Sequence, residues 1–376
     1  MTKPAQGHGA GMSSAKGRAD ALSFVACLVI LAASAFGREN DWVRAAQGKT
    51  RLGRELGAMQ TRGYYEALID ANRDADPDAP PPGWVPFGAS GIAQPTEDYI
   101  HLRLRPNADL VWNGARFRTN SKGYRTPEVA LPKPHHVYRI VFFGSSNTMG
   151  HGVGDDEAYP RLMEPWLDGA TDPATRVEVV NLSVSGDSPS RRLSRMVDEA
   201  AGYQPDWILC DATVLDPALE EMHLEAIVRA EPRPEIPPVL DYVRQALDRC
   251  GASPTDPPDV LRGKLQGQAE SILQGGYRGW AEFAQSAGVP MTIVMIPRAD
   301  AKLASPAVEK VMRSAVLANG LDVIDLSHAF QSLSVDEFRV SPWDKHPSVK
   351  GHRAIFEAFR EAMLVRGKLP GLELLR

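Results

Sequence analysis

The chain has 376 residues, of which 43% are apolar and 24% carry a charged side chain. This length and composition favour one large globular domain with an appendage and exclude a mainly disordered chain. The formal charge of −5 gives no electrostatic reason to expect nucleic acid as a partner, because neutralising phosphates requires concentrated Lys and Arg. Cys27, Cys210 and Cys250 lack the spacing of a disulfide framework or a zinc cluster, so we interpret them as packing residues.

Residues 21–37 are predicted to enter a membrane. The run from Ala21 to Phe36 contains no charge and follows Lys16 and Arg18, which is typical of an N-terminal anchor or a cleaved signal segment. A buried core helix is the alternative interpretation. Both membrane interpretations predict an extracytoplasmic location for the remainder, in the periplasm or at the cell surface, or secretion if the segment is cleaved.

The regions around this segment differ in composition. Residues 1–20 are rich in Gly, Ala, Ser and Lys and are predicted to form a flexible tail. Residues 38–91 are predicted to form a helical stalk followed by a linker rich in Pro and Gly. In residues 92–134, short extended segments alternate with Asn and Gly turn signals, which predicts a small β appendage.

Residues 135–376 alternate apolar runs with helical patterns, and the predicted strands are Tyr138–Phe143, Val177–Leu182, Trp207–Asp211, Met291–Ile296 and Leu321–Asp325. Apolar strands separated by helices predict a three-layer α/β/α, flavodoxin-like domain with a parallel sheet. Functional loops are then expected at the carboxyl ends of the strands. The proline-rich segment 231–258 interrupts this rhythm and is predicted to be an insertion, either a lid or a structural excursion.

The first candidate site residue is Ser146. It lies in VYRIVFFGSSNTMGHGV, residues 137–153, where a buried strand runs into a turn of small residues and then toward a helix expected near Glu157. Such a turn exposes a hydroxyl near backbone N–H groups that can stabilise an oxyanion. Ser146 is therefore the candidate nucleophile, with Ser145 as a competitor. Alternatively, the polar residues 145–148 only cap the helix and bond the turn.

The second candidate element is WDKHPSVKGHRAIFEAF, residues 343–359. His346 precedes Pro347 and an amphipathic helix, and Asp344 lies two residues earlier. His346 is thus a candidate general base, with Asp344 to orient its ring. Alternatively, Asp344 caps the helix and His346 is a solvated loop residue. His352, inside the helix, is predicted to be structural.

Together these elements resemble the SGNH hydrolases, also called GDSL-type esterases, over about Val137 to Leu364. The first family block, Gly-Asp-Ser-x-Thr, aligns with GSSNT at 144–148, which implies that Ser146 is the nucleophile. VVNLSVSGDS at 179–188 is similar to the second block and implies Gly186, beside the Ser146 N–H, as an oxyanion-hole donor. The last block pairs Asp with His ahead of Pro, which implies Asp344 and His346 as the other catalytic residues.

Two departures from the family pattern bear on activity. Ser145 replaces the Asp of the first block, which should change hydrogen bonds of the turn without removing the nucleophile. Where the third block has Gly-x-Asn-Asp, the chain has Thr213-Val214-Leu215-Asp216, so the oxyanion-hole Asn is missing. Losing one such donor can cost about 10²- to 10³-fold in turnover. Asp211, Thr213 or a residue of the insertion are the candidates to fill the gap.

The resemblance implies an exported serine ester hydrolase or O-acyltransferase that acts on an acylated carbohydrate or another small ester through an acyl-enzyme. The alternative hypothesis is a catalytically degenerate SGNH scaffold that binds a glycan or a partner protein, which the missing Asn favours. No cofactor is expected. Nine histidines are present, but none pairs with a second His or Cys at metal-ligand spacing.

Overall fold

The computed structural model describes residues 80–297 and 306–375. These residues belong to one compact unit, Ala58–Arg376. The predicted tail at 1–20, the apolar segment at 21–37 and most of the predicted stalk lie outside the described residues. Within the described ranges, no helix has both the length and the apolar character needed to cross a membrane.

The core of the domain is a sheet of five parallel strands in the order β6-β5-β7-β8-β9. Their bounds are Val137–Phe143 (β5), Arg176–Asn181 (β6), Trp207–Ala212 (β7), Met291–Met295 (β8) and Asp322–Asp325 (β9). Every residue of β5, β7 and β8 is buried, because the runs are apolar and helices cover both faces. The predicted parallel sheet and its α/β/α class are confirmed.

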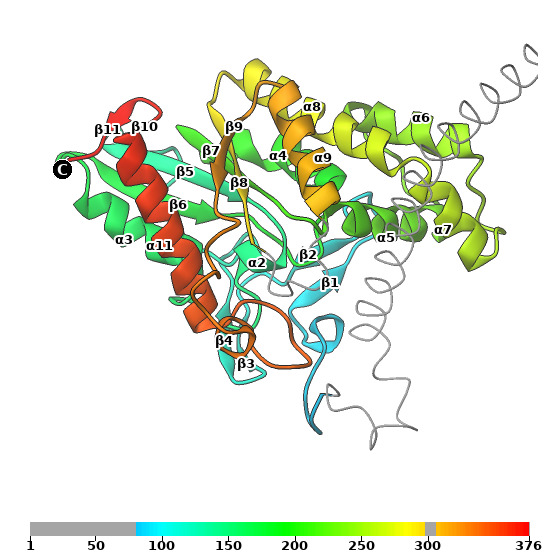
Figure 1. Ribbon diagram of the computed structural model, residues 1–376, viewed down its shortest axis with the longest axis horizontal. Coiled ribbons are helices and arrows are strands. Elements are labelled where there is room, and N and C mark those ends of the chain that lie inside the picture. The colour runs from blue at the N-terminus through cyan, green and yellow to red at the C-terminus, as the bar shows by residue number, and fades with distance from the viewer. Residues whose placement is uncertain (1–79, 298–305, 376) are drawn as a thin grey trace, which may run out of the picture. The chain divides into compact units, whose positions relative to one another are not determined.

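Helices pack on both faces of this sheet (Figure 1). The helices α3 (Tyr159–Gly169) and α11 (Val349–Arg366) form one layer, with Met163 and Phe359 in its apolar core. The opposite layer contains α4 (Pro189–Tyr203), α5 (Asp216–Arg229), α8 (Ala269–Ala287) and α9 (Pro306–Ala318). Shorter elements of the unit are η3 (Phe87–Ala89), α2 (Ser146–Met149), α10 (Val335–Phe338), β10 (Lys368–Leu369) and β11 (Leu372–Glu373).

The strand order fixes where a site can form. The chain runs from β5 outward to β6 and then crosses back to β7 on the other side of β5. The loops that leave the carboxyl ends of β5 and β7 therefore diverge, and an opening between them is the usual ligand position in parallel sheets. Ser146 follows β5 directly, so it lies at this switch point.

The segment before β5 forms two small antiparallel sheets. One pairs β1 (Ala93–Pro95) with β2 (Leu102–Leu104), and the other pairs β3 (Asp109–Trp112) with β4 (Ala115–Arg118). Asn113 and Gly114 connect β3 to β4, both with positive φ, as tight two-residue hairpins require. Arg125, which follows β4 in this segment, donates to the carbonyl of Val153 at 2.6 Å, which attaches the segment to the main domain.

The proline-rich segment 231–258 contains a short helical turn, η4 (Pro238–Leu240), and α6 (Asp241–Cys250), and is followed by α7 (Pro258–Gln266). Val243, Ala246 and Leu247 of α6 are buried in the same apolar core as α4 and α8. The segment therefore extends the helical layer on that face of the sheet.

His352 of α11 makes the stability of the fold depend on pH. Its Nδ1 accepts a hydrogen bond from the backbone N–H of Tyr159 at 3.3 Å, and its ring is fully buried. Burial, followed by the charges of Arg125 and His346, lowers the pKa of His352 from 6.5 to about 3. The unfolded chain therefore takes up this proton first as the pH falls, so stability is lost between pH 6.5 and about 3.

We expect His352→Asn, which keeps an acceptor but cannot titrate, to flatten the dependence of the unfolding free energy on pH below 6.5. The expected change in slope is about 1 kcal/mol per pH unit. Urea unfolding between pH 7 and pH 4 measures it. His328→Asn, at an exposed histidine, is the control and should leave the slope unchanged. An unaltered slope in His352→Asn would contradict the assignment.

Candidate active site

The turn that carries Ser146 begins where β5 ends. Gly144 follows the strand, and Ser145 precedes the short helix α2 with extended backbone angles. A Cβ on Gly144 would lie 2.4 Å from Asp211 Oδ2 and 2.6 Å from Thr148 Cβ, so only glycine fits there unless these side chains shift. Ser146, the first residue of α2, is half-buried, whereas its neighbours on both sides are buried.

Asp211 of β7 fixes this turn through hydrogen bonds. Its Oδ2 accepts hydrogen bonds from the Ser145 N–H at 2.9 Å and from the Thr148 hydroxyl. The same carboxylate lies 3.1 Å from Nη1 of Arg192, and both side chains are fully buried. The two hydrogen bonds and the ion pair together fix the backbone that carries Ser146. Asp211 thus binds the serine turn rather than filling the place of the missing Asn.

The loop after β6 runs beside the same turn. The N–H of Val184 donates to the carbonyl of Gly144 at 3.2 Å, and Asn181 Nδ2 donates to the carbonyl of Thr148 at 2.7 Å. These bonds bring the loop that contains Gly186 next to the serine turn. Gly186 has a φ of +80° and is half-buried, so its backbone reaches the surface at this edge.

Asp344 and His346 contact one another on the loop before α11. His346 Nδ1 lies 2.7 Å from Asp344 Oδ1, and the backbone N–H of His346 donates to the same oxygen at 3.2 Å. Asp344 is buried, whereas His346 is partly exposed. The Ser341 hydroxyl accepts from the Asp344 N–H, and Ser348 caps α11, so both ends of the loop are fixed.

His151 connects the two loops, and the sequence analysis missed it. Its backbone N–H donates to the carbonyl of Ser146 at 3.0 Å, while its ring stacks on His346 with centroids 3.7 Å apart and planes at 14°. Beside it, a Cβ on Gly152 would lie 2.6 Å from Val340, which shows how closely the loops pack. The serine turn and the histidine loop therefore share one edge of the sheet. The structure records no hydrogen bond between the Ser146 hydroxyl and the His346 ring.

Burial and neighbouring groups change the pKa values of Asp344 and His151 in this cluster. Burial alone would raise the pKa of Asp344, but His346 and His151, together with hydrogen bonds from His346, hold it well below its ordinary range. Burial lowers the pKa of His151 well below 6.5, and the neighbouring His346 lowers it further. Near neutral pH the cluster thus contains an ionised Asp344 and a neutral His151.

Two of the expected oxyanion donors are present, but no side chain replaces the missing Asn among the candidates that the structure describes. The N–H groups of Ser146 and Gly186 donate to no other group in the described ranges, so both are free for a ligand. Thr213, one of the candidates for the missing Asn, accepts a hydrogen bond at its hydroxyl from the Leu215 N–H at 3.1 Å. Leu215 itself is half-buried and carries no polar side chain.

His151, Asp344 and His346 also bring three potential metal ligands together, with ligand atoms within 4.8 Å of one another. An imidazole binds a metal through a lone pair in the plane of its ring. The planes of His151 and His346 are nearly parallel, so both rings cannot direct lone pairs at one ion between them. In addition, Asp344 already receives the hydrogen bond from His346. The arrangement fits proton transfer better than metal binding.

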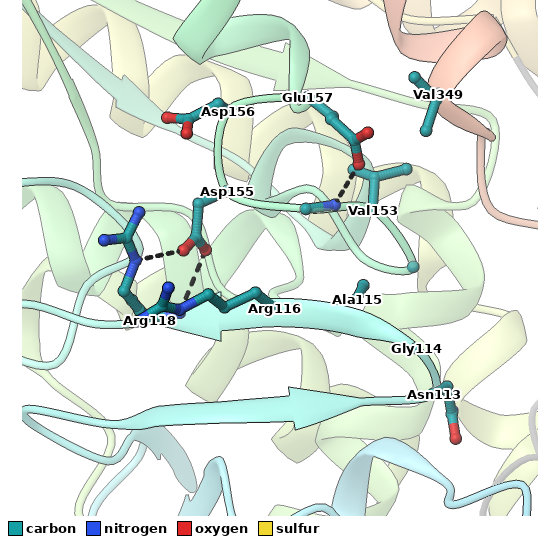
Figure 2. A pocket seen from close by; sticks show the side chains of 12 residues that line it. Asn113, Gly114, Ala115, Arg116, Arg118, Val153, Asp155, Asp156, Glu157 and Val349 are labelled. Atoms are coloured by element: carbon teal, nitrogen blue, oxygen red, sulfur yellow. Dashed lines mark hydrogen bonds and ion pairs between the residues drawn. The ribbon is translucent and has the colours of Figure 1, made fainter.

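A pocket of about 660 Å³ opens beside this cluster, between the β3–β4 hairpin, the loop 152–157 and the start of α11 (Figure 2). Asp155 points to Arg118 across it and binds that guanidinium at 2.6 Å. Glu157 accepts from the Gly154 N–H at 2.6 Å on the same loop. None of Ser146, Asp344 and His346 lines this pocket, so we assign the chemistry to the neighbouring edge of the sheet.

We expect Gly144→Ala to destabilise the protein by about 1–3 kcal/mol, because the added methyl group overlaps Asp211 and Thr148. Urea unfolding measures the loss. Gly202→Ala is the matched control, since no heavy atom lies within 4 Å of a Cβ at this position near the end of α4. The control should leave stability unchanged or raise it by up to about 1 kcal/mol. Equal stability of both variants would show that the turn tolerates a side chain.

Several solved structures resemble this chain at low sequence identity. The lipase/acylhydrolase from Enterococcus faecalis is 16% identical with a TM-score of 0.39, covering 64% of this chain and 99% of that chain. A catalytic mutant of Axe2, an acetylxylan esterase from Geobacillus stearothermophilus, is 16% identical with a TM-score of 0.38, covering 60% and 94%. Esterase EstA from Pseudoalteromonas sp. is 12% identical with a TM-score of 0.36, covering 61% and 97%.

No curated protein shows significant similarity to the chain. Residues 142–354 match the GDSL-like Lipase/Acylhydrolase family. The match begins at the end of β5 and runs into α11, so it contains both the serine turn and the loop with Asp344 and His346. Because it spans more than half of the sequence, this protein belongs to the GDSL-like lipase/acylhydrolase family.

Proposed function

We propose that this protein is an exported serine ester hydrolase or O-acyltransferase that acts on an acylated carbohydrate or another small ester. The observation that carries the proposal is the 2.7 Å hydrogen bond between Asp344 and His346, on a loop that packs against the serine turn. Family membership supports chemistry at ester bonds. The apolar segment 21–37, preceded by Lys16 and Arg18, supports export and anchoring in a membrane.

In the first half of the reaction, the Ser146 hydroxyl oxygen attacks the ester carbonyl carbon while His346 accepts the proton of that hydroxyl. Asp344 orients the ring and stabilises the imidazolium that forms. The free N–H groups of Ser146 and Gly186 donate hydrogen bonds to the carbonyl oxygen and stabilise its negative charge. When the intermediate collapses, the bond to the alcohol breaks and His346 returns the proton to that alcohol, which leaves an acylated Ser146.

In the second half, the oxygen of the acceptor attacks the acyl carbon while His346 removes a proton from that oxygen. Collapse of this intermediate breaks the bond to Ser146, and His346 gives the proton back to the serine oxygen. Water as acceptor gives hydrolysis, and a sugar hydroxyl gives acyl transfer. The half-buried position of Ser146 is compatible with either acceptor.

The competing proposal is a degenerate scaffold that binds a glycan or a partner protein without turnover. Leu215 favours it, because this residue stands where the family pattern supplies an oxyanion donor. The ionised, buried Asp344 opposes it. Keeping that charge away from water costs free energy, which His346, His151 and the backbone N–H of His346 offset.

We expect the full-length protein to release p-nitrophenol from p-nitrophenyl acetate and to be labelled by a fluorophosphonate probe, with both activities lost in Ser146→Ala. The expected loss of turnover is about 10⁴-fold or more, since the nucleophile is removed. Ser145→Ala is the matched control and should still be labelled. Adding a sugar acceptor then separates transfer from hydrolysis. If wild type is not labelled, or if Ser146→Ala releases product equally well, the scaffold is the better description.

We expect His151→Ala to lower kcat about 10- to 100-fold with little change in KM, because His346 loses the ring that holds its orientation. His151→Phe should recover most of the lost rate, since it restores a ring face but no ring nitrogen. Steady-state kinetics with p-nitrophenyl acetate measure both variants. A kcat of His151→Ala equal to that of wild type would mean that stacking does not position the base.

A further inference from the structure

A second cluster of buried polar side chains lies beside the serine turn, where α4 and α5 begin. Arg191 comes from the first turn of α4 and His223 from the middle of α5, and both are more than nine-tenths buried. Tyr99 and His101, from the loop between β1 and β2, lie against His223 with ring centroids 4.7 and 5.8 Å away. The appendage and two helices of the main domain thus enclose one polar region.

Arg191 presents an unused edge of its guanidinium group in this region. Its Nη1 donates to the carbonyl of Gly186 at 3.0 Å, but Nε and Nη2 are buried and have no hydrogen-bond partner. Asp187 Oδ1 lies 3.3 Å from Nε without hydrogen-bond geometry, and that carboxylate is bound instead by Arg195 at 2.5 Å. The Nε and Nη2 hydrogens of an arginine point in the same direction, which is the geometry that grips a carboxylate with two bonds.

His223 adds a further unused group. Its Nε2 is buried without a hydrogen-bond partner, as is the hydroxyl of Tyr242 in α6. Burial lowers the pKa of His223 well below 6.5, and the charge of Arg191 lowers it further, which also shows that the two side chains are close. Buried polar groups in folded proteins nearly always have a partner, so several unpaired groups in one region indicate that something polar binds there.

We propose that Arg191 and His223 form a subsite for a carboxylate of the substrate beside Gly186, so that the esters recognised by this protein belong to acidic carbohydrates with uronic acid units. The position fits, because Arg191 is bonded to the residue whose N–H faces the reacting carbonyl in the proposed mechanism. The substrate class rests on the proposed function, whereas the binding of a carboxylate does not.

The charges nearby favour a singly charged group over phosphate. Asp187 lies next to Arg191, and Glu220 of α5 is buried close by, where it accepts from the Ser190 N–H at 3.0 Å and from the Ser190 hydroxyl. Burial raises the pKa of Glu220, but the carboxylate of Asp187 beside Arg191 would repel a doubly charged ligand more strongly than a singly charged one. A carboxylate with one charge and two coplanar oxygens matches the free edge of Arg191.

Calorimetry tests the subsite without turnover. The full-length Ser146→Ala protein is titrated with trigalacturonate, with xylotriose as the neutral arm and with inorganic phosphate. We expect trigalacturonate to bind and xylotriose to bind at least tenfold more weakly. Equal affinities for the two sugars, or tighter binding of phosphate than of trigalacturonate, would overturn the assignment. Because Ser146 is absent, the result does not depend on whether the protein hydrolyses esters.

Substitutions then locate the binding. In the Ser146→Ala background, Arg191→Gln should weaken trigalacturonate binding about tenfold or more, since it removes the charge and the two free donors. His223→Phe keeps a ring against Tyr99 but removes Nε2. Its affinity for trigalacturonate tests the subsite independently if Arg191→Gln does not fold. Arg360→Gln is the matched control, at an exposed arginine of α11 on the other face of the sheet that pairs with Glu357 at 2.8 Å. Unchanged affinity in both Arg191→Gln and His223→Phe would refute the subsite.

Discussion

The site depends on one buried ion pair, between Asp211 and Arg192. Asp211 is the second-last residue of β7 and accepts hydrogen bonds from the turn after β5, while Arg192 comes from α4 and also binds Asp216 at the start of α5 at 2.7 Å. One pair of charges therefore ties together the loops that follow three neighbouring strands. Since a buried charge without a partner is costly, these loops cannot move apart independently. This constraint keeps the edge of the sheet in one geometry, so that the serine turn is preorganised.

The sequence predicted the sheet well, because strands buried on both faces are written as continuous apolar runs, as in VYRIVFF at β5. The contact between Asp344 and His346 was also predictable, since the two residues are close along the chain. Asp211 was harder to interpret. We considered it as a substitute for the missing Asn, whereas in the structure it bonds Ser145 and Thr148, a role that depends on a neighbouring strand and has no local sequence pattern.

His151 and Arg191 escaped the sequence analysis for the same physical reason. A histidine in a Gly-rich turn looks like a solvated residue, and an arginine in the first turn of a helix looks like a surface charge. Their importance comes from burial by distant segments. His151 is covered by Trp112 and Phe87, with ring centroids 4.4 and 6.0 Å away, and His223 near Arg191 is covered by Tyr99. Only a prediction of how the appendage folds back could have identified either residue.

The appendage is therefore part of the structure that surrounds the candidate site. The ring of Trp112 in β3 packs against the ring of His151 at 72°, and its indole N–H donates to the Val85 carbonyl at 2.7 Å. Residues outside the family's matched segment therefore support the histidine pair. A shortened protein designed around residues 142–354 alone would keep every group of the proposed triad yet leave His151 facing solvent. Engineered fragments, chimeras and substrate-range comparisons thus need to begin upstream of Val85.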